Sequence, residues 1–283
     1  MKCAGIQMTC GPDIEANRKK ACEMVQMAVE SGADIVAFQE MFCLPWFPHE
    51  ENKDHFHLAE ELEGPTIQLF KRLALEKGIV LICPIFEKEG TQYYNSAVVI
   101  GPDGEIIGKY RKIHIPNLPF WQERFYFHSG DLGFPVFKTP FGSIGVLLSW
   151  DIFFPEGTRI LALKGADLLF VPTSAAFASQ QRWEKVICGN AISNNVYIFR
   201  INRVGREKEQ HFYGKSFCVN PNGEMIAEPA GLKDAIVFAK VDLGEVQRSR
   251  AIWTFFRDRR PKEYGDLLKY EAGTEWPKSS LGQ

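Results

Sequence analysis

The sequence predicts a layered α/β or α+β domain made of two similar halves. Short apolar runs alternate with amphipathic helical segments, and two hairpin signals lie among them. Residues 31–36 and 164–169 share one pattern, in which a glycine ends a helix and an aspartate precedes an apolar strand. Buried runs mixed with hairpins are typical of sheets that carry helices on one face and pack together through the other.

In the first half, apolar runs predict strands at residues 2–9, 34–38, 79–83, 94–100 and 105–110. Asp13 is suited to cap a helix whose apolar residues recur at three- and four-residue spacing and that ends at Gly32. A second helix is expected from Pro65 to Gly78, because proline fits the first turn and glycine the end. The sequence Gly-Pro-Asp-Gly at 101–104 predicts a hairpin turn.

In the second half, the same signals predict strands at residues 144–148, 167–171, 196–201 and 235–241. Helices are expected from Pro155 to Gly165 and over residues 182–195. Glu156 then falls in the first turn of its helix, where its charge favours the helix dipole, so we interpret it as structural. The sequence Asn-Pro-Asn-Gly at 220–223 predicts a second hairpin turn.

The composition indicates one globular domain over residues 1–283, with no linker and no low-complexity segment. The net charge is -2 with both signs interspersed, which argues against a nucleic-acid partner.

No apolar run reaches the roughly 20 residues that a membrane span needs. The first residues enter a strand pattern at once, and the seven cysteines form no CxxC pair. We therefore expect a cytoplasmic protein with reduced thiols and without a metal site, since the six histidines lack ligand spacing as well.

Two charged residues adjoin strand runs. Glu40 follows the apolar run 35–37, and a carboxylate there is costly unless it is paired or functional. A surface glutamate at the start of a loop is the simpler alternative. Lys112 ends a basic cluster at 109–112, for which a solvated charge run is the simpler interpretation. His114, two residues on, is expected to be a hydrogen-bonded structural histidine.

Two further residues have unusual surroundings. Glu123 lies among large aromatic residues, where burial would raise the pKa of its carboxyl, although simple pairing with Arg124 is the alternative. Ser149 stands where the apolar run 145–148 gives way to a turn and a helix start. Hydrolases expose a nucleophile at such a strand end.

In this order and at these separations, the segments around Glu40, Lys112, Glu123 and Ser149 resemble the carbon–nitrogen hydrolase (nitrilase) superfamily. Further similar segments lie at residues 165–173, 202–205 and 258–265, so that the resemblance covers nearly the whole chain. It implies a four-layer αββα sandwich.

The resemblance also implies roles. Glu40 corresponds to the general base, Lys112 to the cation that stabilises the tetrahedral oxyanion, and Glu123 to the glutamate that orients Lys112 and the substrate nitrogen. Position 149 corresponds to the nucleophile. Attack on an amide-like carbon, proton transfer to the leaving amine and hydrolysis of the acyl-enzyme need these groups and no metal or cofactor.

The resemblance is strongest to amidases and N-carbamoyl amidohydrolases of the N-carbamoylputrescine amidase type. Asp151 follows Trp150, whereas members that cleave nitriles typically have a glutamate there. The expected substrate is a linear amide or N-carbamoyl amine, partly apolar or cationic, with a nitrile as the alternative. Candidate substrate-binding residues are Trp46, Trp121, Trp150 and Thr173. The segments 120–122 and 175–177 depart from the pattern of this branch, which leaves the exact substrate open.

Ser149 is the main departure, because the family's nucleophile is a cysteine. A serine hydroxyl is a far weaker nucleophile at neutral pH, and a carboxylate is a poor base for it. The chain is then an engineered cysteine-to-serine form, a natural pseudoenzyme that binds a ligand, or a working serine amidase. We favour the first, because the neighbouring motifs are intact.

The C-terminal tail, about residues 251–283, is expected at the interface of a homo-oligomer. Residues 251–256 are strongly apolar, and exposure of such a segment promotes aggregation. The residues that follow hold little apolar material for a core of their own. Folding back onto the same subunit is the alternative.

Overall fold

The computed structural model describes residues 1–176, 179–227 and 229–269. Its first sheet has six strands, in the order β14 (Ala235–Lys240), β1 (Lys2–Gln7), β2 (Ile35–Phe38), β3 (Val80–Glu89), β4 (Gln92–Ile100) and β5 (Ile106–Arg111). The strands β1, β2 and β3 are parallel, whereas β14, β4 and β5 join the sheet antiparallel to their neighbours.

The second sheet also has six strands, in the order β13 (Met225–Ala227), β12 (Phe217–Val219), β9 (Tyr197–Asn202), β8 (Leu168–Thr173), β7 (Gly142–Val146) and β6 (Val136–Thr139). Its central strands β7, β8 and β9 are parallel. A separate hairpin consists of β10 (Val204–Glu207) and β11 (Gln210–Tyr213).

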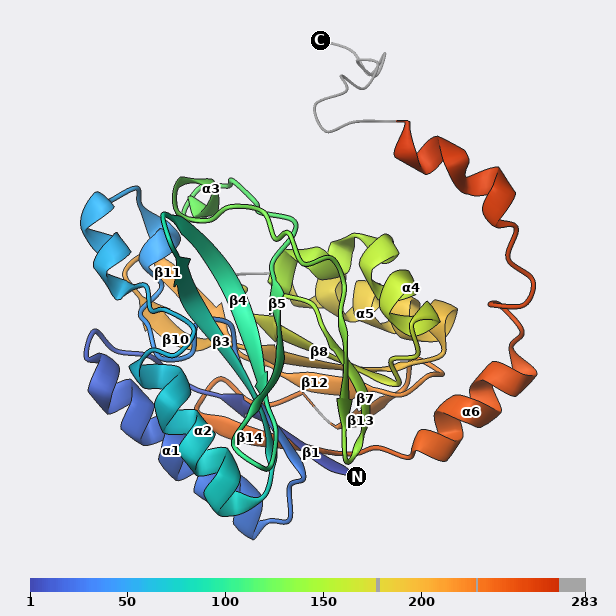
Figure 1. Cartoon of the computed structure of the whole chain (residues 1–283), viewed down its shortest axis with the longest axis horizontal. Helices are drawn as coiled ribbons and strands as arrows, with labels where there is room; N and C mark the ends of the chain where they lie inside the picture. The colour runs from blue at the N-terminus through green and yellow to red at the C-terminus, as the bar shows by residue number, and fades with distance from the viewer. Residues whose placement is uncertain (177–178, 228, 270–283) are drawn as a thin grey trace.

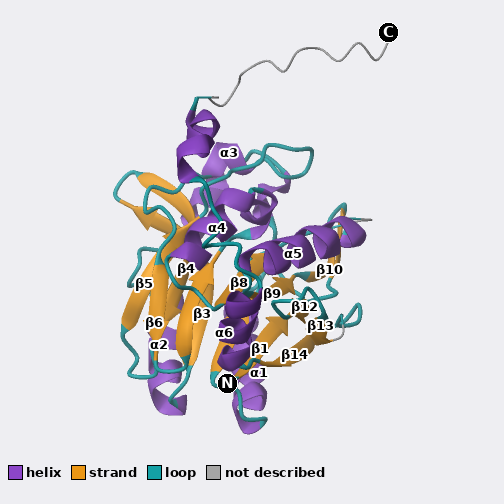
Figure 2. Ribbon diagram, turned by 90° about the vertical axis from the view of Figure 1, so that its right-hand side faces the viewer, coloured by secondary structure: helices purple, strands orange, loops and turns teal. Residues whose placement is uncertain are grey.

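Helices cover the outer face of each sheet (Figure 1). On the first sheet lie α1 (Ile14–Glu30) and α2 (Pro65–Lys77), and one apolar cluster fills the space beneath them. On the second sheet lie α4 (Pro155–Leu163) and α5 (Gln180–Asn194), as Figure 2 shows from the side. A larger apolar cluster joins the inner faces of the two sheets and continues beneath α4 and α5. The predicted four-layer αββα sandwich is therefore confirmed.

The sheets approach closely where β1 passes β9. A Cβ atom on Gly5 would lie 2.8 Å from Cγ1 of Ile201 and 2.8 Å from Cζ of Phe199. Real Cβ atoms do not approach so closely, so a larger residue would force the sheets apart. The spacing of the two halves, and with it the position of the strand ends that carry the site, depends on this glycine.

Most predicted elements are present, but one strand is longer than predicted, and several elements, among them the helix Leu243–Ile252, were not predicted. The strand predicted at 79–83 extends to Glu89, because the charged residue Glu87 is buried beside Arg111, with Nη2 of Arg111 2.8 Å from its Oε1. The strand β6 and the hairpin β10–β11 were not predicted. Both are short and rich in polar residues, so they lack the apolar run on which the prediction depends.

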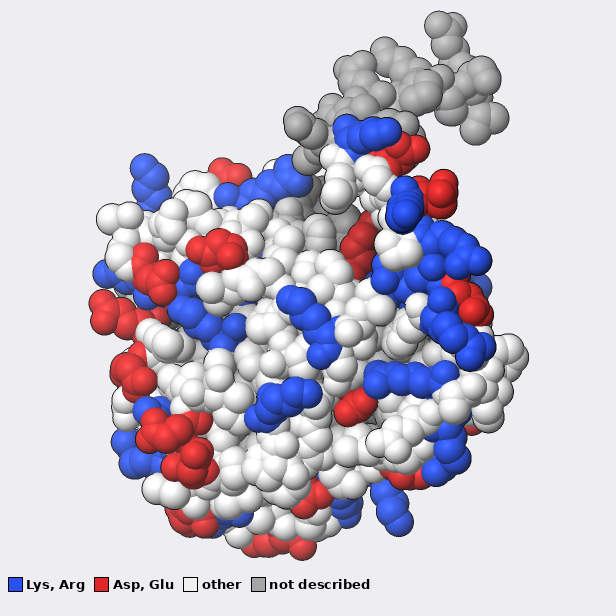
Figure 3. All heavy atoms as spheres, turned by 45° about the vertical axis from the view of Figure 1, so that its right-hand side comes forward, with Lys and Arg blue, Asp and Glu red and all other residues white. Residues whose placement is uncertain are grey.

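The chain continues beyond the sandwich in helix α6 (Leu243–Ile252) and the helical turns η4 (Pro261–Leu268). Figure 1 shows this segment running along the outside of the second half and away from the body. Among the described helices, none is both long and apolar enough to span a membrane. Figure 3 shows side chains of both charges spread over the face that it presents.

Candidate active site

Three polar side chains of the candidate site come shortly after the ends of strands. Glu40 follows β2, Lys112 follows β5, and Ser149 opens the short helix η3 (Ser149–Phe153) a few residues after β7. Glu123 is the first residue of the short helix α3 (Glu123–Tyr126). Glu40, Lys112 and Glu123 are almost completely buried. A charge at such a position must be paired, because its transfer from water is costly.

Lys112 supplies the pairing for both glutamates. Its Nζ atom lies 2.9 Å from Oε1 of Glu40 and 2.6 Å from Oε2 of Glu123. Asn95 donates a second hydrogen bond to Oε1 of Glu40, at 2.8 Å. The other carboxylate oxygen of Glu40, Oε2, is buried and has no hydrogen-bond partner among the described residues. One oxygen therefore fixes the carboxylate, and the other remains able to accept a proton.

Burial and the neighbouring charges shift the pKa values of Lys112 and Glu123 in opposite directions. Burial acts to lower the pKa of Lys112, but the carboxylates of Glu123 and Glu40 outweigh it, and the pKa lies above its ordinary value. Lys112 is thus a fixed cation at every ordinary pH. Burial raises the pKa of Glu123 to about 7, against the attraction of Lys112. The raised pKa of Glu123 agrees with the direction expected from its aromatic surroundings.

Ser149 has a backbone φ of 48°, in the left-handed region that side-chain-bearing residues seldom adopt. Strained backbone of this kind persists where the surrounding structure holds it, and it is concentrated at functional sites. The residue is largely buried and contributes to the wall of a cavity that Glu123 also lines. The side chain is thus presented at a sharp turn between a strand and a helical segment.

Asp151 holds this turn in place, a role that was not predicted from the sequence. Its Oδ2 accepts hydrogen bonds from the Leu148 backbone N–H at 3.2 Å and from the Tyr110 hydroxyl at 2.7 Å. Its Oδ1 lies 2.9 Å from the backbone nitrogen and 2.8 Å from Nδ1 of His114. One buried carboxylate therefore ties the Ser149 turn to the segment that carries Lys112. His114 has the hydrogen-bonded structural position expected for it.

Arg203 holds the loop after Glu40 in a similar way. Its Nη2 donates to the backbone oxygens of Glu40 at 3.1 Å, Met41 at 2.8 Å and Leu44 at 3.0 Å. Met41 itself has a positive φ of 48°, which these bonds help to maintain. The sequence marked Arg203 only as part of a similar segment, because one arginine in isolation does not reveal which carbonyl groups it will reach.

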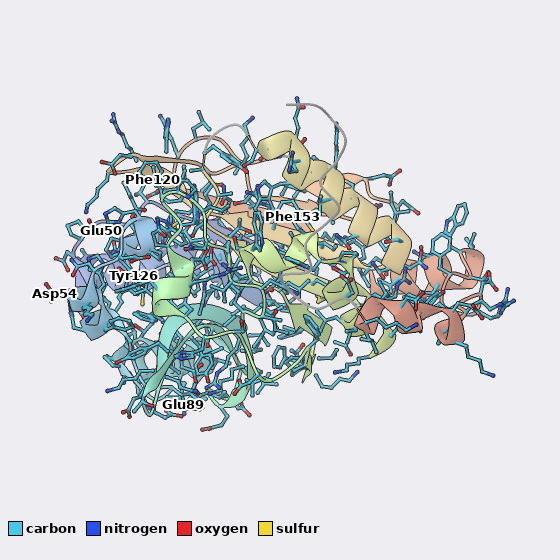
Figure 4. All side chains as sticks on the ribbon, turned by 90° about the horizontal axis from the view of Figure 1, so that it is seen from above. Glu50, Asp54, Glu89, Phe120, Tyr126 and Phe153 are labelled. Carbon is cyan, nitrogen blue, oxygen red and sulfur yellow. The ribbon has the colours of Figure 1, made fainter. Side chains whose placement is uncertain are left out.

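A cavity of about 540 Å³ opens beside these residues. Aromatic side chains form much of its wall, and they are Trp121, Trp150, Phe153 and Trp183. The Phe153 ring packs against the Trp183 ring of α5 with centroids 4.6 Å apart, and Figure 4 shows Phe153 beside that helix. The cavity has the size and apolar lining of a small-molecule site.

The structure places two of the four predicted substrate-binding residues in the cavity wall. Trp121 and Trp150 line it, where they could contact a substrate. Trp46 is buried behind Trp121, with ring centroids 6.3 Å apart, and therefore supports the wall from outside. The position of Thr173 differs from the prediction, because its buried hydroxyl donates to the backbone oxygen of Val171 at 2.8 Å and does not line the cavity.

An aromatic cluster fixes α3, and with it Glu123. The Tyr126 ring packs edge-on against Phe47, with centroids 4.9 Å apart, and its hydroxyl donates to the Glu50 backbone oxygen at 2.7 Å. Figure 4 shows Tyr126 on the same side of the molecule as Glu50 and Asp54. Rigid aromatic packing of this kind holds the Glu123 carboxylate in one position.

Among the described residues, no three His, Cys, Asp or Glu side chains are grouped as a metal ion requires. The site holds the Lys112 ammonium between the Glu40 and Glu123 carboxylates, beside a cavity that Ser149 lines. Such an arrangement suits attack on a carbonyl carbon, with a charge ready for the developing oxyanion.

The family model for carbon-nitrogen hydrolases matches residues 2–251. The chain belongs to the carbon-nitrogen hydrolase family. This carbon-nitrogen hydrolase is 39% identical to the N-carbamoylputrescine amidase of Arabidopsis thaliana over 285 residues, 95% of each chain. It is 35% identical to the citrullinase of Francisella tularensis, over 95% of its own length and 98% of that relative. A carbon-nitrogen hydrolase structure from Helicobacter pylori G27 superposes with a TM-score of 0.91 at 35% identity, over 95% and 98% of the two chains.

Proposed function

We propose that this fold hydrolyses the C–N bond of a linear amide or N-carbamoyl amine through a covalent acyl-enzyme. The observation that carries the proposal is the buried Lys112 ammonium between the Glu40 and Glu123 carboxylates, next to a cavity that Ser149 lines. The similarity to an N-carbamoylputrescine amidase and a citrullinase supports this substrate class.

In the proposed mechanism a thiol at position 149 attacks the carbonyl carbon of the substrate. Glu40 takes the thiol proton on Oε2, the oxygen without a partner among the described residues, and later gives it to the leaving nitrogen. The oxyanion that forms faces the Lys112 ammonium, whose position two carboxylates fix. Water, deprotonated by Glu40, then releases the acyl group and restores the thiol.

Serine at position 149 interrupts this sequence at the first step. A carboxylate takes a proton from a thiol far more readily than from an alcohol, and the alcohol is the weaker nucleophile. The pairing of Lys112 and the contacts of Asp151 at the turn support the proposal that the other parts of the machinery are present. We therefore propose that this chain is an inactivated form of a cysteine enzyme and that it retains the ability to bind substrate.

The Ser149→Cys variant tests the proposal. We expect it to release ammonia from amides or N-carbamoyl amines, and to act on them faster than on matched nitriles. Ser31→Cys is the control, because it adds a thiol at an exposed position away from the cavity. Failure of Ser149→Cys on every compound would favour a ligand-binding pseudoenzyme, and preference for nitriles would reverse the assignment of the branch.

We further propose that residues 1–283 form one domain, that about 251–283 lie at a homo-oligomer interface and that the location is cytoplasmic. Helix α6 is attached to the second half, where Nη2 of Arg250 donates to the Ala166 backbone oxygen at 2.6 Å. The seven cysteines are all free, as a reducing compartment would keep them. Residues 270–283 of the proposed interface lie outside the described residues.

A further inference from the structure

The ionisable side chains of the cavity wall differ in whether they are already paired with another charge. Among the described residues that line the cavity, Glu123 and Arg182 are the two that carry charge. Glu123 is 1% exposed, and its Oε2 lies 2.6 Å from the Lys112 ammonium. Its carboxylate is thus already paired at the reaction centre, and the described wall offers no second carboxylate to a cationic substrate.

Arg182 stands in a different position. It lies in the first turn of α5 and is exposed to solvent. Its guanidinium makes no side-chain hydrogen bond or ion pair with any described residue. The nearby side chains of α5 are engaged elsewhere, since Gln180 and Glu184 are hydrogen-bonded to each other. An arginine has five N–H donors in a planar fork, which matches the two oxygens of a carboxylate.

A second cation lies behind the same wall. The guanidinium of Arg200, on β9, sits 4.6 Å from the centre of the Trp183 ring, on which it packs. It is fully buried, and its side chain bonds to the Tyr213 hydroxyl at 2.9 Å and to Oε1 of Gln180 at 3.3 Å, with no carboxylate bonded to it among the described residues. Glu184 exerts a weaker attraction on Arg200 from a distance. Little negative charge thus offsets Arg182 and Arg200 on this side of the cavity.

We propose that Arg182 selects substrates that carry a carboxylate at the end remote from the scissile C–N bond. The inference rests on the proposed function and narrows it to an N-carbamoyl or amide compound with an acidic tail. The aromatic rings of the wall that Ser149 and Arg182 also line suit a hydrocarbon linker. An ammonium tail would gain contact with those rings, but it would meet Arg182 as a like charge and find no free carboxylate in the described wall. Of the partly apolar or cationic substrates that the sequence left open, those with a cationic tail are therefore disfavoured.

Three ureas of similar length test the inference: 4-ureidobutyrate, which is anionic, butylurea, which is neutral, and 4-ureidobutylamine, which is cationic. Their binding to the chain with Ser149 is measured by calorimetry, and their hydrolysis by the Ser149→Cys variant is measured by ammonia release. We expect 4-ureidobutyrate to bind about ten-fold tighter than butylurea, as a charge-assisted hydrogen bond at a partly exposed site would give. Added salt should reduce that ratio.

Arg182→Gln should abolish the preference, and Arg182→Glu should reverse the order of the two charged ureas. Lys185→Gln is the control, because it removes the same charge from an exposed position of α5 outside the cavity wall. The inference is overturned if 4-ureidobutylamine binds as well as 4-ureidobutyrate, or if Arg182→Gln leaves their ratio unchanged. Failure of all three ureas and of matched amides to bind or react would instead overturn the proposed function, and this inference with it.

Discussion

The Nζ atom of Lys112 lies 2.6 Å from Oε2 of Glu123, and both side chains are buried. Taking two charges out of water costs several kcal/mol per ion, and only close pairing with further hydrogen bonds offsets that cost. Here Glu40 completes the arrangement, at 2.9 Å from the same Nζ atom. The result is an ammonium held in one position by two carboxylates, as the oxyanion stabilisation that we propose for it requires.

Replacement of Lys112 by methionine should affect both stability and turnover. Lys112→Met leaves two buried carboxylates without their cation, which we expect to lower the free energy of unfolding by about 3–5 kcal/mol. In the Ser149→Cys background it should reduce kcat at least about 100-fold, because the oxyanion loses its fixed charge. Urea unfolding and ammonia release measure the two effects.

The double variant Lys112→Met, Glu123→Gln separates these effects. Removing one of the two carboxylates that have lost their cation should recover part of the lost free energy of unfolding, whereas kcat should remain low. Recovery of turnover in the double variant, or full activity of Lys112→Met alone, would contradict the role proposed for Lys112.

Glu40→Gln addresses the proton transfer. Glutamine has nearly the shape of glutamate and keeps an oxygen that accepts from Asn95 and Lys112, but it cannot take a proton from the nucleophile. In the Ser149→Cys background we expect kcat to fall by about 10²–10⁴, with ligand binding to the Ser149 chain retained. Glu156→Gln, at an exposed position in the first turn of α4, is the matched control. An unchanged kcat in Glu40→Gln would exclude Glu40 as the base.

Stability should depend on pH through Glu123. Burial raises its pKa from the ordinary value of 4.5 to about 7, so the folded protein holds this proton more tightly than the unfolded chain does. The stabilisation is complete below pH 4.5 and is lost as the pH rises to about 7. Its size is on the order of a few kcal/mol.

Glu123→Gln cannot ionise, so its free energy of unfolding should fall less between pH 5 and pH 7.5 than that of the parent chain. Urea unfolding at several pH values gives both curves, and Glu156→Gln should follow the parent. Parallel curves for the parent and Glu123→Gln would show that the pKa of Glu123 is not raised in the folded protein.

The sequence predicted the layers of the sandwich because their buried strands appear in it as apolar runs. The apolar runs that became β1, β2, β8 and β9 are fully or nearly fully buried, and the Asp13 cap of α1 is present, with its side chain accepting from the Ala16 backbone N–H at 3.1 Å. The hairpin β10–β11 was missed because its residues are mostly polar. Its stability comes from tertiary contacts that no local pattern displays.

The residues of the site, like the elements of the fold, include some that the sequence predicted and others that it did not. The positions of Glu40, Lys112, Glu123 and Ser149 followed from short motifs in a fixed order, and the structure brings the first three into contact beside the cavity. The contacts of Asp151 with Tyr110 and of Arg203 with the Glu40 backbone join residues far apart in the sequence. Such long-range partners are fixed by the packing of the two halves and cannot be read from spacing.

Exposed apolar side chains on the C-terminal segment lead us to expect association in solution. Leu267 and Leu268 in η4 are 64% and 88% exposed, and Ile252 and Trp253 at the end of α6 are 72% and 54% exposed. None of the residues of η4 is buried, so its leucine side chains are open to solvent in the described part of the chain. Apolar side chains gathered on an extended segment are typical of a surface that a partner covers.

We expect the protein to form at least a dimer in which this segment contacts a second copy. Light scattering at micromolar concentration should give at least twice the subunit mass of 32.2 kDa. Leu267→Asp with Leu268→Asp should shift the equilibrium towards the monomer, because each charge would have to be buried in the interface. Lys262→Asp, at an exposed polar position of the same turns, should leave the mass unchanged. A monomeric mass for the unaltered chain would show instead that these side chains stay in water or fold back onto their own subunit.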